Sequence, residues 1–137
     1  MVFGALVLVL VQAGLGMVVN LYVSIPGHHP GTRGGGYFDR SFHSVVWAIG
    51  HGATALAIHA TLGLLLILMS ISVARRAFAV GRRAVGTWTT VAGLLILGAA
   101  FNGASFLDFN YDVSSLIMAL LAFAAAASYA VALYLLA

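Results

Sequence analysis

Residues 43–74 read HSVVWAIGHGATALAIHATLGLLLILMSISVA, a run without a single Asp, Glu, Lys or Arg. A helix that crosses the hydrocarbon core of a bilayer needs about 20 mostly apolar residues. The run is longer than this minimum, so its first turn, around His43, is expected to stand in the membrane interface. The stretch predicts a membrane-spanning helix and sets the class of the whole protein.

Three further segments, working outward from this run, are long and apolar enough to span: residues 2–23, 87–107 and 113–137. Short connections make consecutive helices antiparallel neighbours. The sequence therefore predicts an all-α integral membrane protein, with four antiparallel transmembrane helices in a bundle. Residues 1–137 form a single transmembrane domain. Its longest connection is an outer loop over residues 24–42, rich in glycine and containing both prolines.

Composition supports the same class. The chain has 137 residues, of which 63% are hydrophobic and 7% are charged. A soluble domain carries roughly 25% charged residues, so this chain cannot clothe a soluble globule. Soluble enzymes, nucleic-acid-binding proteins and disordered proteins are excluded, and no nucleic-acid partner is expected. The absence of cysteine excludes disulfides and thiolate metal sites.

Orientation follows from the arginines. The short loop over residues 75–86 begins RRAFAVGRR and carries four of the six basic residues: Arg75, Arg76, Arg82 and Arg83. The positive-inside rule places such a loop in the cytoplasm. Both termini are then cytoplasmic, whereas residues 24–42 and the turn at 108–112 lie outside. We expect the protein in the plasma membrane of a bacterium.

Histidines are the conspicuous polar residues within the predicted spans. His59 lies near the membrane midplane, and His51 lies about two turns below the outer surface. Either imidazole suits the iron of haem b, with Met17, Met118 or a histidine of another subunit as the second ligand. Alternatively, His59 forms an interhelical hydrogen bond with Gln12, a link worth about 1 kcal/mol in membranes.

The stretch HGATALAIHATLGLLLIL, residues 51–68, resembles the histidine-bearing helices of small four-helix membrane b-type cytochromes and of respiratory-complex anchor subunits. The resemblance covers about one helix of four and is one of architecture. It implies haem b and electron transfer linked to a quinone. Those families place their ligands on two helices, and this chain does not.

A second group of polar residues shares one predicted depth near the outer face. Its members come from all four predicted helices: Asn20, His51, Asn102 and Ser115. Such a layer suits a ligand site or a water-filled vestibule, and it also fits the ordinary polarity of helix ends. A passive channel for a small neutral solute would pass through the same layer.

The outer loop and the turns that flank it hold a third set of candidates. His28, His29, His43 and Asp39 offer imidazole and carboxylate ligands for Zn²⁺ or Cu²⁺, although their spacing matches no strong motif. Residues 101–110 read FNGASFLDFN, a distinctive local stretch to which no family can be attached.

These observations predict a small membrane protein without an assignable catalytic set. Its most favoured role is a non-catalytic subunit or accessory protein of a membrane complex, with a polar ligand-binding layer near the outer face. The expected partners are the lipid bilayer and either further copies of the chain or a larger complex. The alternatives are electron transfer through haem b or a quinone and, less strongly, a solute channel, so enzymatic activity stays open.

Overall fold

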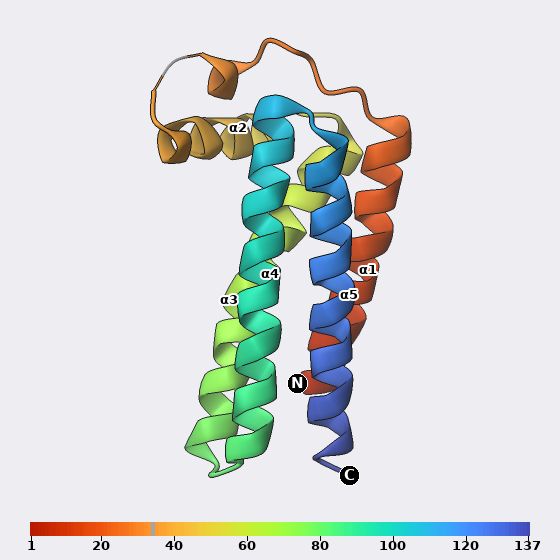
Figure 1. Ribbon diagram of the computed structural model, residues 1–137, viewed down its shortest axis with the longest axis vertical. Helices are drawn as coiled ribbons and strands as arrows, with labels where there is room; N and C mark the ends of the chain where they lie inside the picture. Colours follow the sequence, from red (N-terminus) through yellow and green to blue (C-terminus); the bar gives the residue numbers. More distant parts are fainter. Residues whose placement is uncertain (34) are drawn as a thin grey trace.

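The computed structural model describes residues 1–33 and 35–137 of the chain, and every element in this part is helical. Its elements are α1 (Val2–Tyr22), the short 3₁₀ helix η1 (Pro30–Thr32), α2 (Tyr37–His51), α3 (Thr54–Ala79), α4 (Arg83–Phe109) and α5 (Asp112–Tyr134). Four helices are long and run side by side, whereas α2 lies across one end of them (Figure 1). The predicted all-α class is confirmed.

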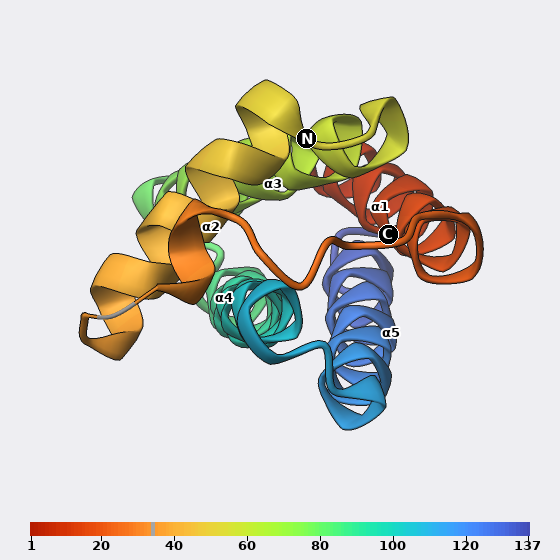
Figure 2. The same ribbon diagram turned by 90° about the horizontal axis from the view of Figure 1, so that it is seen from above.

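The four long helices, α1, α3, α4 and α5, are each long and apolar enough to cross a membrane. Figure 2 shows them in a ring, in which α1 packs on α3 and α5, and α4 packs on the same two helices. Neighbours in this ring run in opposite directions, and both termini lie at the same end (Figure 1). The predicted four-helix antiparallel bundle is confirmed.

The two ends of the bundle differ: one carries four arginines and the other is covered by α2 and the loop before it. The arginine end holds Arg75, Arg76, Arg82 and Arg83, which lie in or beside the short connection from α3 to α4. The opposite end is covered by a cap, which comprises residues 24–33 and 35–51 and therefore includes η1 and α2. Helices α3 and α4 extend into the predicted arginine-rich loop, and only residues 80–82 connect them.

One predicted helix is wrong in its course. Residues 43–74 do not form a single helix, because α2 ends at His51 and α3 begins at Thr54. Gly52 is extended, with φ −71° and ψ 165°, and its N–H bonds to the carbonyl of Trp47. A Cβ at Gly52 would lie 2.5 Å from the Ala48 carbonyl oxygen, so this sharp turn depends on the missing side chain.

The observed outer loop is shorter than the predicted one, because part of it belongs to α2. Helix α2 begins at Tyr37, inside the stretch 24–42 that composition assigns to a loop. It takes up residues from that loop and from the start of the predicted long helix. The chain thus turns at Gly52 from a helix lying across the bundle into a helix running along it (Figure 1).

Apolar side chains pack in two clusters. The larger cluster joins the four long helices toward the arginine end and includes Val9, Leu66, Ile96 and the fully buried Tyr129. The smaller one consists of Val19, Ala48, Leu56 and Leu107, and it joins the cap to the bundle. Many large apolar side chains on the long helices remain exposed, as expected where lipid covers them.

Candidate functional site

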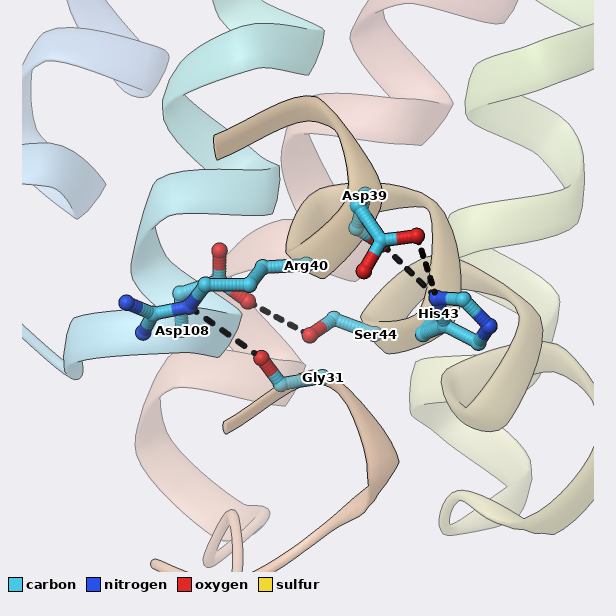
Figure 3. A network of polar contacts seen from close by, with 6 residues as sticks. All are labelled: Gly31, Asp39, Arg40, His43, Ser44 and Asp108. Carbon is cyan, nitrogen blue, oxygen red and sulfur yellow. Dashed lines mark hydrogen bonds and ion pairs between the residues drawn. The ribbon is translucent and has the colours of Figure 1, made fainter. Parts of the chain in front are cut away.

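A buried polar junction lies where α2 meets the last turn of α4. Asp108 is only 9% exposed, and its carboxylate accepts a hydrogen bond from the hydroxyl of Ser44 (Figure 3) and a longer one, of 3.5 Å, from that of Ser41. Ser41 and Ser44 are themselves buried on the face of α2 that packs against the bundle. The sequence places Asp108 in a turn outside the spans; this is wrong, because α4 continues to Phe109 and the cap covers the carboxylate.

The short helix η1 completes this junction. Gly31 is buried against α2, and its carbonyl accepts a hydrogen bond of 3.3 Å from Nε of Arg40 (Figure 3). The guanidinium of Arg40 lies 4.7 Å from the centre of the Phe109 ring, within the range of a cation–π contact. Arg40 therefore joins three elements at once: η1, α2 and the end of α4.

His29 fixes the loop to both helices. Its ring stacks on Trp47 with centroids 4.5 Å apart and planes inclined by 13°. Its Nε2 donates a 3.0 Å hydrogen bond to the carbonyl of Leu107, which assigns the proton to that nitrogen. Nδ1 is buried with no hydrogen-bond partner among the described residues. The imidazole is thus part of the packing between the loop, α2 and α4.

The N-terminal end of α2 contacts α4 one to two turns before α4 ends. The Tyr37 hydroxyl bonds to Ser105 Oγ at 2.8 Å and donates to the Phe101 carbonyl at 3.1 Å. The ring of Phe38 meets that of Phe101 edge to face, with centroids 6.3 Å apart. The stretch FNGASFLDFN, residues 101–110, is therefore the surface on which the cap docks.

The predicted metal ligands are not gathered into one cluster. His43 Nδ1 lies 3.5 Å from an Asp39 oxygen and 2.8 Å from the Asp39 carbonyl, so these two residues pair on exposed α2. His29 is taken up by Trp47 and Leu107, as described above. Among residues 1–33 and 35–137, no group of three His, Cys, Asp or Glu side chains could hold a metal ion.

The predicted polar layer is assembled only in part. Ser115 Oγ donates a 3.0 Å hydrogen bond to Asn20 Oδ1, which joins α5 to α1. Asn102 bonds instead to the Gly98 carbonyl of its own helix. His51 ends α2 and is exposed. Two of the four residues therefore meet, and the other two have separate surroundings.

The expected contact between Gln12 and His59 is present in the middle of the bundle. Nε2 of Gln12 donates a 2.8 Å hydrogen bond to the His59 carbonyl and lies 3.5 Å from His59 Nε2. Two glycines make room for the pair: a Cβ at Gly16 would lie 3.1 Å from the His59 ring, and one at Gly63 would lie 3.1 Å from Gln12 Nε2. Gly63 thus leaves room for the Gln12 side chain, and Gly16 lets the backbone of α1 approach the His59 ring.

The haem hypothesis stays a prediction. Nε2 of His59 faces the Gln12 amide, and Nδ1 is buried without a hydrogen-bond partner among the described residues. The other predicted ligands have separate surroundings. His51 is exposed at the end of α2, Met17 is 59% exposed, and Met118 packs against Gly103.

Replacing Gln12 by alanine is expected to lower the free energy of unfolding by about 1 kcal/mol, the size of an interhelical hydrogen bond in a membrane protein. The loss is small because the His59 carbonyl still lies within α3, where it can accept the backbone hydrogen bond of the helix. Unfolding in mixed micelles with increasing denaturing detergent measures it. Val11→Ala, at an exposed position on the same helix, is the control, and equal losses in both variants would refute the link.

Comparisons with known proteins give no further assignment: no protein-family model, no curated protein and no solved structure matches the chain. The site is therefore interpreted from its own geometry.

Proposed function

We propose that the protein is a non-catalytic subunit or accessory protein of a membrane complex. The proposal rests on one observation: the Asp108 carboxylate accepts hydrogen bonds from two serine hydroxyls of α2. A buried carboxylate whose two oxygens each accept a hydrogen bond from a neighbouring helix favours a structural role, since removing it would leave buried hydroxyls unpaired. Gln12, His29 and Arg40 are likewise engaged in contacts between elements.

The hydrogen bonds between the cap and the bundle hold the outer surface of the cap in place. Beyond its buried face, the cap presents several exposed polar side chains to water: His28, Arg33, Asp39 and His43. Side chains of both charge signs on a rigid surface are suited to recognising another protein. We place the partner, either a second copy or another subunit, against this polar side of the cap.

The proposed orientation rests on charge. The four arginines of the arginine end face the cytoplasm by the positive-inside rule, which puts the cap outside. Because both termini lie at the arginine end, they are cytoplasmic in this arrangement (Figure 1). We propose the plasma membrane of a bacterium as the location of the protein. The bonded pair Asn20–Ser115 contributes to the polar layer beneath the cap.

The size of the assembly extracted from native membranes in mild detergent tests the proposal. We expect the wild-type protein in an assembly larger than one copy, and the double variant Asp39→Ala/His43→Ala as a single copy. Ser72→Ala/Thr87→Ala is the matched control, because these exposed hydroxyls bond only to their own helices at the arginine end. A single-copy wild type, or an unchanged assembly in the cap variant, would contradict the proposal.

A further inference from the structure

Helix α2 leaves one apolar face exposed. The face is a stripe of four apolar side chains, exposed by 37–73%: Phe38, Phe42, Val46 and Ile49. At about 100° per residue they fall within an arc of about 80°. We infer that this stripe lies in the lipid of the leaflet nearest the cap, and that α2 is an in-plane membrane helix.

The first argument is the division of α2 into three sectors. Ser41, Ser44 and Ala48 face the bundle, about 120° to one side of the stripe. The pair Asp39 and His43 is exposed and lies about 80° to the other side. A helix at the edge of a membrane protein meets three environments, namely protein, lipid and water. The sectors of α2 match these three in composition.

The second argument is the position of the loop. His29 and Gly31 cover α2 on the side of Arg40, Ser44 and Trp47, about 170° from the stripe. In Figure 1 the loop and η1 pass over α2 on the side away from the arginine end. The stripe therefore faces toward the arginine end, which is the direction in which the bilayer lies.

Depth and continuity supply the third argument. Tyr37 bonds to Phe101 and Ser105, about two turns and one turn before α4 ends, so α2 begins below the end of a spanning helix. Phe38 touches Phe101, which is itself 43% exposed on α4. The stripe thus continues the lipid-facing surface of the bundle. Figure 2 shows the first half of α2 projecting sideways beyond the four long helices.

An amphipathic helix in the plane of the interface buries its apolar face at the boundary between headgroups and acyl chains. Aromatic and large aliphatic residues are typical of the apolar face of such a helix, which suits Phe38 and Phe42 in the stripe. Lipid is therefore the partner that the stripe fits. This inference does not rest on the proposed subunit role, which concerns the polar side chains of the cap.

Single-cysteine labelling tests the inference directly, because the chain has no native cysteine. Phe42→Cys and Val46→Cys place an environment-sensitive fluorophore on the stripe, and His43→Cys places it one residue away on the polar sector. The proteins are reconstituted in nanodiscs of phosphatidylcholine and phosphatidylglycerol, where both faces are accessible. One quencher is a nitroxide on the upper acyl chain of the lipid, and the other is dithionite in the water.

We expect the fluorophore at positions 42 and 46 to be quenched by the lipid nitroxide and to react with dithionite many-fold more slowly than at position 43. Equal dithionite rates at 42, 43 and 46 would place the stripe in water and overturn the inference. Protection of 42 and 46 from both quenchers would also overturn it, since a second copy or another protein would then cover the stripe. Circular dichroism of each labelled variant checks that the helices are retained.

Discussion

Replacing Gly31 by alanine is expected to release the cap from the bundle. A Cβ at position 31 would overlap the hydroxyl oxygen of Ser44 and lie 2.7 Å from the backbone carbonyl of Arg40. The serine side chain can rotate away, but the backbone carbonyl cannot. Overpacking of a tight contact costs about 1–3 kcal/mol, and here the cost falls on the docking of η1 against α2.

Hydrogen exchange of the α2 amides measures this release, because opening of the cap exposes them while the four spans stay protected. The matched control is Gly27→Ala in the same loop, where an added Cβ has no neighbour within 4 Å. Gly31→Ala and Ser44→Gly should together cost less than the sum of their separate effects, since the added Cβ meets the side chain that the second change removes. Equal exchange in Gly31→Ala and Gly27→Ala would show that the close approach is not required.

Replacing Asp108 by alanine is expected to destabilise the cap by about 1–3 kcal/mol, the cost of leaving buried hydroxyls without a strong acceptor. Asp108→Asn keeps one carboxamide oxygen as an acceptor, so its effect should be smaller. The same α2 amides report both changes.

A double-mutant cycle with Ser44→Ala separates the contact from general damage. If Ser44 and Asp108 act through their hydrogen bond, the double variant loses less cap stability than the sum of the losses in the two single variants. Phe109, whose ring contacts Arg40 of the cap, supplies the comparison: the effects of Phe109→Ala and Ser44→Ala on cap stability should be more nearly additive. Strict additivity of Asp108→Ala and Ser44→Ala would refute the assigned role of the carboxylate.

The spans could be predicted because hydropathy and length decide them. Three predicted helices, 2–23, 87–107 and 113–137, lie within a few residues of the observed bounds Val2–Tyr22, Arg83–Phe109 and Asp112–Tyr134. The contact between Gln12 and His59 followed from their common depth. These features depend on the membrane and on distance along a helix, which the sequence contains.

The cap could not be predicted because its features depend on contacts between distant residues. Gly52 breaks the helix through its approach to Ala48, in a stretch that has no charged residue to mark the break. Asp108 is buried only because α2 covers it. One signal was present: Ser41, Ser44 and Ala48 form a small and polar stripe at helical spacing, opposite in character to the aromatic stripe of Phe38 and Phe42.

The central feature of the fold is that α2 lies across the cap end and is docked on α4. The distance between spin labels at Phe38→Cys and Phe101→Cys, in nanodiscs, tests this most directly. The two native rings lie 6.3 Å apart, so a short and narrow distance distribution is predicted. A single straight helix through Gly52 would carry residue 38 about 22 Å beyond Ala53, and a correspondingly long or broad distribution would contradict this arrangement.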